Sequence, residues 1–178
     1  MQRILMTWIL IFWAASIGAA QGSSPVVEAK IVMETNVAHR NSTARAAVVA
    51  HVAPGYHIND HKPTLDYLIP TELKLEPVGQ VTVKDIVYPK GKPIRFAFSD
   101  MPLSVYEGTV VVGAVLQIAR AALPGAYPVK GKLVYQACND HACLPPASVP
   151  LALTIKVVRR SVPVKHLNAD VFDRIQFE

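Results

Sequence analysis

The sequence contains only two cysteines, no strongly clustered charge and no internal repeat or low-complexity stretch. Two cysteines cannot form the disulfide framework that holds small secreted folds together, so a hydrophobic core must stabilise this chain. Its 18 Lys and Arg residues are scattered and form no dense tract beyond Arg159 and Arg160. Nucleic-acid-binding proteins need a clustered basic stripe, so we interpret these charges as a solvated surface and expect no nucleic-acid partner.

Long apolar runs are also scarce, since only residues 4–17 approach the length of a membrane segment. Arg3 precedes this run, and the small residues Gly18 and Ala20 lie three and one positions before a possible cut after Ala20. This pattern predicts a secretory signal peptide over residues 1–20. A full membrane span needs roughly 20 residues, although an uncleaved anchor stays open as the alternative. No cysteine lies near the cut, which argues against a lipid anchor.

The rest of the chain predicts strands almost throughout. Alternating or β-branched runs cover residues 29–37, 45–52, 65–69, 73–75, 81–87, 94–98, 109–119, 131–136 and 149–158. Turn signals containing Pro, Gly, Asn or Asp separate these runs. Residues 110–120 contain enough alanine for a helix, but their valines favour a strand. Strands at this spacing predict an all-β, immunoglobulin-like antiparallel β-sandwich.

Residues 161–178 break the strand pattern. Their apolar residues fall at helical spacings, namely Leu167, Val171, Phe172 and Ile175. Asn168 and Asp170 are candidate N-caps, so we expect a short C-terminal helix or a loosely held extension. The chain therefore divides into a signal peptide (1–20), a sandwich domain (21–160) and a C-terminal extension (161–178).

The two cysteines lie between a predicted strand that ends near Gln136 and another that begins near Val149. Four residues separate Cys138 from Cys143, so a disulfide would close a loop of about six residues. On the chain-entropy estimate such a loop stabilises a fold by about 2 kcal/mol, against nearly 5 for a loop of about 100 residues. The pair is a weak staple but a good reversible switch, because both sulfurs stay close in either redox state. Spacing alone favours a structural disulfide, as is usual for an isolated exported pair.

Side chains next to the cysteines suit thiol chemistry. His141 lies inside the loop, and a nearby imidazolium would favour the attacking thiolate. Asp140 would act in the opposite direction. Pro145 and Pro146 remove two backbone donors and stiffen the exit from the loop.

A metal site is a third interpretation of this region. His57 and His61 stand four residues apart, and together with His141 and two thiolates they could hold copper or zinc. Pro63 follows closely, which argues against a shared helical face for the first two histidines. We therefore predict no metal ligands.

Three blocks of the sequence carry a resemblance to a known family. The first is Tyr135-Gln136-Ala137-Cys138, followed by a second cysteine, a Pro-Pro pair and an apolar strand. The second covers residues 54–59 and 67–71, and a weaker third covers 88–98 and 105–108. Together they span most of residues 29–158 and resemble the N-terminal periplasmic domain of the thiol:disulfide interchange protein DsbD.

The resemblance implies an immunoglobulin-like sandwich with a redox-active disulfide at one end. Family members receive electrons from a thioredoxin-like domain and pass them to periplasmic partners such as disulfide isomerases and cytochrome c maturation thioredoxins. By this resemblance Cys143 forms the mixed disulfide with partners and Cys138 resolves it. We therefore expect a periplasmic protein with thiol–disulfide exchange activity and no cofactor.

The resemblance also points to residues that support the cysteines. Tyr56, His57 and Asn59 belong to a stretch that packs beside the pair, shielding the sulfurs and tuning their thiolate content. The family's aromatic cap loop corresponds to residues 88–98, with Phe96 as the cap residue. From the residues alone, an alternating strand is the better interpretation of Phe96 and Phe98. The supporting residues are Tyr56, His57, Asn59, Phe96, Tyr135, Asp140, His141 and Pro145.

Two departures from the family bear on partners. The best-known members have one residue more between the cysteines, and they carry an acidic cap where this chain has the basic segment 90–95. The full family proteins also continue into a membrane-embedded electron carrier and a C-terminal thioredoxin-like domain. We therefore expect a standalone version served by a separate membrane electron carrier and by thioredoxin-like proteins. A non-catalytic binding module with a structural disulfide is the alternative.

Overall fold

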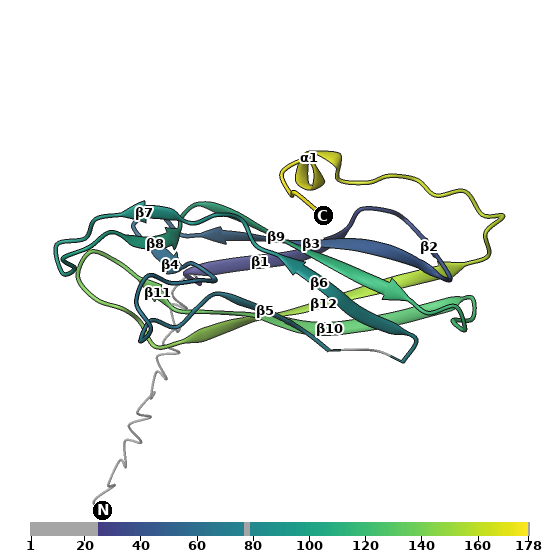
Figure 1. Cartoon of the computed structure of the whole chain (residues 1–178), viewed down its shortest axis with the longest axis horizontal. Coiled ribbons are helices and arrows are strands. Elements are labelled where there is room, and N and C mark those ends of the chain that lie inside the picture. The colour runs from purple at the N-terminus through teal and green to yellow at the C-terminus, as the bar shows by residue number, and fades with distance from the viewer. Residues whose placement is uncertain (1–24, 77–78, 178) are drawn as a thin grey trace, which may run out of the picture.

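The structure, a computed structural model, describes residues 25–76 and 79–177 (Figure 1). One sheet has the order β1–β3–β9–β6, with β1 (Val27–Met33), β3 (Ser42–Val52), β9 (Thr109–Ile118) and β6 (Val81–Val87). A second has the order β2–β12–β10–β5, with β2 (Ala38–His39), β12 (Ala147–Val158), β10 (Gly125–Tyr135) and β5 (Glu72–Leu75). Their strands pair antiparallel except for the short β2–β12 contact. The predicted all-β, immunoglobulin-like sandwich is confirmed.

Period-two alternation along the long strands builds the core between these two sheets. On β3, the side chains of Ala46, Val48 and Ala50 are at most 1% exposed. Leu133 of β10 and Ile155 of β12 are equally buried and belong to the same cluster. Full burial of a large aliphatic side chain contributes roughly 1.5–3 kcal/mol. A few such residues therefore outweigh the small stabilisation expected from the disulfide loop.

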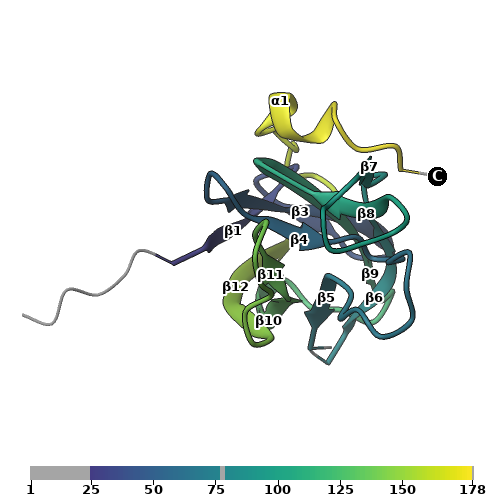
Figure 2. The ribbon, with the colours of Figure 1, turned by 90° about the vertical axis from the view of Figure 1, so that its left-hand side faces the viewer.

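A third sheet extends one end of the sandwich. Its order is β11–β4–β8–β7, with β11 (Ala137–Cys138), β4 (His57–Asn59), β8 (Leu103–Tyr106) and β7 (Lys92–Ile94). β10 leads into β11 through Gln136, and β8 leads into β9 through a turn at Gly108, whose φ is 63°. These strands lie at the left-hand end of Figure 1, and Figure 2 views the molecule from that end. The cysteine loop is therefore at one tip of the fold.

One predicted strand is absent, and another ends earlier than predicted. Residues 65–69 form turns rather than a strand, and Leu65 and Leu68 pack against a small apolar cluster that contains Phe96. The predicted strand over 94–98 was also wrong beyond Ile94, where β7 ends. In these loops Leu65, Leu68 and Phe96 pack inward, whereas Tyr67, Ile69 and Phe98 are exposed. Loop side chains that alternate between a small core and solvent therefore resembled a strand pattern.

The C-terminal extension packs on the outer face of the β1–β3–β9–β6 sheet. Its predicted helix is present as α1 (Ala169–Phe172), and Phe172 is 7% exposed. Asn168 precedes the helix with a φ of 54°, but its side chain donates to the carbonyl of Met33 instead of capping. Figure 2 shows α1 on the side of this sheet away from β10 and β12. The alternative of a loosely held extension is therefore wrong for residues 161–177.

The predicted signal peptide, residues 1–20, lies outside the described residues. Among the residues that are described, no helix has the length and apolar character needed to cross a bilayer.

Candidate functional site

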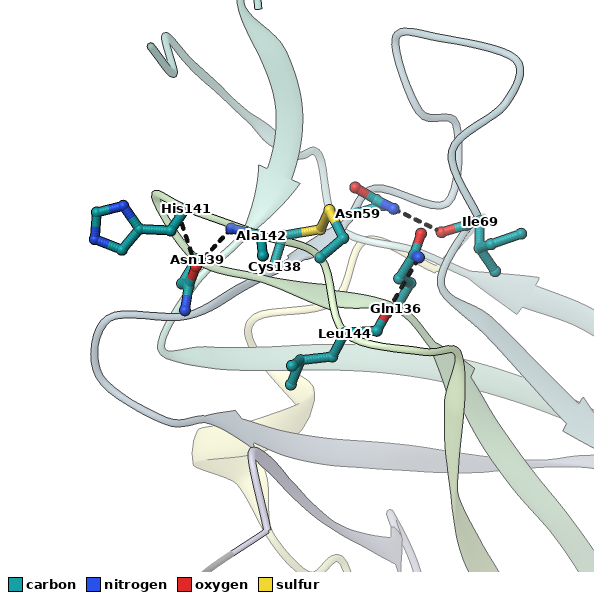
Figure 3. Close-up of a disulfide and its surroundings, with 9 residues drawn as sticks. Asn59, Ile69, Gln136, Cys138, Asn139, His141, Ala142 and Leu144 are labelled. Carbon is teal, nitrogen blue, oxygen red and sulfur yellow. Dashed lines mark hydrogen bonds between the residues drawn. A yellow bond between two sulfur atoms is a disulfide. The ribbon is translucent and has the colours of Figure 1, made fainter. Parts of the chain in front are cut away.

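The two cysteines close a short loop at the end of β11. An isolated antiparallel bridge joins Cys138 to Cys143, and the backbone N–H of Leu144 donates to the carbonyl of Ala137 at 2.8 Å. The Gln136 side chain adds a bond from Nε2 to the Leu144 carbonyl at 3.2 Å (Figure 3). Backbone and side-chain bonds thus hold the entry and exit of the loop together independently of the sulfurs.

Asn139 shapes the interior of the loop. Its Oδ1 accepts hydrogen bonds from the backbone N–H groups of His141 and Ala142, both at 2.9 Å (Figure 3). Its own backbone N–H donates to the Ala142 carbonyl at 3.0 Å. Asparagine favours such turns because its short amide can replace a backbone acceptor. No role was predicted for Asn139 from the sequence, although an Asn directly after the first cysteine of so short a loop is a recognisable turn signal.

The sulfurs of Cys138 and Cys143 form a disulfide with an S–S distance of 2.03 Å. The two residues differ sharply in exposure, because Cys138 is 1% exposed within β11 whereas Cys143 is exposed beyond it. Of the two cysteines, Cys143 is therefore the one that lies at the surface of this tip.

His57 lies on the neighbouring strand directly opposite Cys138. Residues opposed in an antiparallel pair project from the same face, so the imidazole and the Cys138 side chain share one side of the β4–β11 pair. Burial lowers the pKa of His57, and the negative charges of Glu107 and Asp140 oppose this shift only in part. His57 is therefore uncharged at neutral pH.

Phe96 covers His57 from the loop that follows β7. The two rings stack with centroids 4.2 Å apart, and Phe96 is 8% exposed. Its ring also stacks on Phe98, at 5.3 Å between centroids, and Phe98 is 51% exposed. Cys138, His57, Phe96 and Phe98 thus form a series that runs from the buried sulfur to an exposed aromatic rim.

Comparison with known families decides the identity of this fold and loop. Residues 24–154 match the family described as thiol:disulfide interchange protein DsbD, N-terminal. The chain belongs to this family. The match includes the whole cysteine loop and every supporting residue predicted from the sequence.

The solved structures that resemble this chain are only distantly similar to it in sequence. The N-terminal periplasmic domain of ScsB from Proteus mirabilis has a TM-score of 0.50 and 14% identity, over 71% of this chain. This chain spans 45% of that one. The DsbD N-terminal domain in complex with the PilB N-terminal domain, from Neisseria meningitidis, gives 0.41 and 20% over 78% of this chain and 88% of that one. A type I cohesin from Pseudobacteroides cellulosolvens gives 0.46 and 12%, over 79% and 97%. These likenesses concern the fold alone, and no match was found among curated proteins.

Within the DsbD N-terminal domain, the other predicted supporting residues are divided between loop and core. His141, Asp140 and Pro145 are exposed, and Figure 3 shows the His141 ring directed away from the disulfide. Tyr135 is 7% exposed in the main core, and burial raises its pKa. Tyr56 is half-buried against the same core. The His141 imidazole therefore does not lie beside the sulfurs.

Asn59 fastens a neighbouring loop. Its side-chain Nδ2 donates to the Ile69 carbonyl at 2.9 Å, and its backbone carbonyl accepts from Thr71 Oγ1 at 2.6 Å. Asn59 is 1% exposed and both bonds span the loop of residues 60–71. The residue therefore holds the base of this loop beside the cysteine strand.

Asp60 anchors the same loop to β8. Its carboxylate accepts hydrogen bonds from the hydroxyls of Tyr106 and Ser104. Burial acts to raise the pKa of Asp60, but these bonds and those from the backbone N–H groups of Lys62 and His61 outweigh it, so the pKa is lowered. Sequence reasoning missed this residue, because its partners are more than forty positions away.

The histidines proposed as metal ligands face different partners. His57 stacks on Phe96, whereas the His61 ring lies parallel to Tyr88 with centroids 3.7 Å apart. In the described part of the chain, no three His, Cys, Asp or Glu side chains are grouped so that they could hold a metal ion.

Proposed function

We propose that this protein is an exported, periplasmic thiol–disulfide interchange protein that relays reducing equivalents through Cys138 and Cys143. The observation that carries the proposal is the unequal exposure of the two sulfur-bearing residues in a loop of this family. Cys143 is accessible to a partner, and buried Cys138 is held next to it.

The reducing half-cycle begins when a partner thiolate attacks Sγ of Cys143. The Cys138–Cys143 bond breaks, a mixed disulfide forms, and Cys138 leaves as a thiolate that takes a proton from water. The partner's second thiolate then attacks its own bonded sulfur and releases Cys143. The partner dithiol is oxidised to a disulfide, and the cysteine pair gains two electrons and two protons.

The second half-cycle returns these electrons to an oxidised partner. The Cys143 thiolate attacks the partner disulfide and one partner sulfur leaves as a thiol. Cys138, held within reach by β11, then attacks Sγ of Cys143 and releases the second partner sulfur. Attack within a preformed loop avoids a long-lived adduct, because the resolving sulfur is already at bonding distance in the oxidised state.

The hydrogen bonds of the loop favour this function over a structural disulfide. Asn139, Gln136 and Leu144 hold the loop without help from the sulfurs. A six-residue loop also gains only about 2 kcal/mol from its disulfide. The bond can therefore open and close without unfolding the tip, which a redox cycle requires.

Thioredoxin-like proteins are the proposed partners, with a separate membrane electron carrier as the source of reducing equivalents. Exposed apolar side chains on two loops at this tip, Tyr67, Ile69, Phe98 and Met101, support contact with a protein surface. The proposed export signal is residues 1–20, the interchange domain is residues 21–160 and the extension is residues 161–178. Amino-terminal sequencing of the exported protein should find Gln21 first.

Trapping of mixed disulfides tests the proposal. Cys138→Ala, expressed in the source organism, should accumulate adducts through Cys143 that run as heavier bands and disappear with reductant. Cys143→Ala is the matched control and should form few, because the remaining cysteine is buried. Absence of adducts from both variants would contradict exchange, and equal trapping by both would contradict the assigned order of attack.

A further inference from the structure

Four arginines gather at the end of the sandwich opposite the disulfide. They come from the β2–β3 turn, the β9–β10 loop and the segment after β12, all at the right-hand end of Figure 1. Two adjoining hollows of about 430 and 530 Å³ share Arg40 and Arg160 in their linings, Arg159 lines the first and Arg120 the second. We call these four side chains the arginine cluster.

Hydrogen bonds fix the segments that carry the arginine cluster. The backbone N–H of Asn41 donates to the Ala119 carbonyl at 3.3 Å, which joins the β2–β3 turn to the β9–β10 loop. His39 Nε2 donates to the Val162 carbonyl at 2.9 Å, which joins the same turn to the segment after β12. The Val162 N–H in turn donates to the Arg159 carbonyl at 3.0 Å. The backbone segments that carry the four arginines are thus fixed by contacts within the protein.

The segments that carry the arginine cluster contain no acidic residue. Residues 35–59, 108–139 and 141–169 contain no Asp or Glu, and these ranges include all three segments. Across the described residues, ion pairs join Arg45 to Glu34 and Lys74 to Glu72, and none involves the cluster. Four neighbouring guanidinium groups repel one another. Binding of an external anion would be favourable because it reduces this repulsion.

Exposed apolar side chains lie on the same segments. Leu123, on the β9–β10 loop, is 72% exposed, and Val162, after β12, is 39% exposed. A small soluble anion would explain the arginines but would leave these side chains in water. Basic groups combined with exposed apolar groups are typical of surfaces that contact the interface of an anionic bilayer.

We propose that the arginine cluster and Leu123 form a surface that binds anionic phospholipids. Guanidinium groups bind phosphate oxygens in a two-pronged arrangement, so the lipid phosphates would occupy the two hollows while Leu123 enters the interface. Docking through this end leaves the disulfide, at the opposite tip, open to protein partners. Lipid binding at this end does not depend on the redox activity of the cysteines.

Vesicle co-sedimentation tests the proposal. The protein is expressed from the full coding sequence and purified from its host. Vesicles of phosphatidylcholine mixed with phosphatidylglycerol should bind the protein, and vesicles of phosphatidylcholine alone should bind it far less. A basic side chain near an anionic surface changes partitioning roughly fivefold, so Arg120→Gln with Arg160→Gln should weaken binding about 25-fold. Lys90→Gln with Lys92→Gln removes the same charge at the disulfide end, and this control should change binding less than about twofold.

Three results of the vesicle-binding experiments would contradict the proposal. Equal weakening by both double variants would mean non-specific attraction of a basic protein and would overturn the proposal. Failure to bind the mixed vesicles would overturn it as well, including the case in which inorganic phosphate alone binds to the cluster. Leu123→Ser should weaken vesicle binding without changing the fold, and no effect there would also contradict the assignment of a bilayer surface.

Discussion

The two cysteines differ because of the strands around them. Cys138 lies in β11, which pairs with β4, so one side of its backbone is covered by His57 and its neighbours. Cys143 follows the turn, and its backbone pairs with the sheet through the isolated bridge to Cys138. The two cysteines thereby differ in exposure, with Cys143 at the surface and Cys138 buried, as the proposed order of attack requires.

His57 gives the site a dependence on pH that can be measured as stability. Burial holds its folded-state pKa below the ordinary value of 6.5, so the unfolded chain binds the proton first as the pH falls. The free energy of unfolding should therefore decrease as the pH drops below about 6.5, until the folded-state pKa is reached. His57→Phe keeps an aromatic ring against Phe96 and should show a smaller loss between about pH 7.5 and pH 5 by urea denaturation.

The exposed His141 supplies the matched control for that experiment. His141→Phe should keep the wild-type loss of stability, because its ring does not contact the buried site. An undiminished loss in His57→Phe would show that other groups cause the dependence.

At the scale of elements, the long strands and β5 could be predicted, whereas most of the short strands could not. Residues 81–87 match β6, and residues 109–119 extend one residue beyond the end of β9. Both could be predicted because β-branched residues recur along them. β4 and β11 are too short to show any period, and they exist because they pair with each other. The site lies on these short strands, so its cysteines were predictable but its supporting contacts were not.

The aromatic cap shows the same limit. Alternation at Phe96 and Phe98 favoured a strand, whereas the resemblance to the family placed a cap loop there. The structure has a loop in which Phe96 points inward and Phe98 outward. Phe96 alternates with Phe98 because it packs against His57. The local sequence cannot reveal this contact, because His57 lies far away along the chain.

The docking of the C-terminal extension depends on Gly113 of β9. A Cβ at this position would lie 2.8 Å from Ile175 Cγ2 and from Phe177 Cε1. Gly113→Val should displace the extension and lower the free energy of unfolding by about 1–3 kcal/mol, as overpacking generally does. Trypsin should then cut at Arg174 faster than in the wild-type protein.

Gly125 provides a comparison on another strand. A Cβ there would meet only the Leu123 carbonyl, at 4.0 Å, so Gly125→Val should leave cleavage at Arg174 unchanged. Slow cleavage in both variants would mean that the contacts of Ile175 and Phe177 do not hold the extension.

At the scale of the whole molecule, the sandwich separates the disulfide tip from the arginine cluster. The family match covers residues 24–154, whereas β12 continues to Val158 and the extension packs back over the sheet. Phe177 also stacks under Arg45, with the guanidinium 4.6 Å from the ring centroid. Side chains of the extension, among them Ile175 and Phe177, therefore form a second apolar layer on the outer face of the sheet, outside the main core.

The reduction potential of the Cys138–Cys143 pair tests the central claim most directly. Equilibration with glutathione or thioredoxin redox buffers, followed by mass-tagging of free thiols, measures it on the folded protein. A protein that exchanges disulfides with thioredoxin-like partners should have a potential above about −300 mV. A value well below about −300 mV would identify a structural disulfide and contradict the proposed relay.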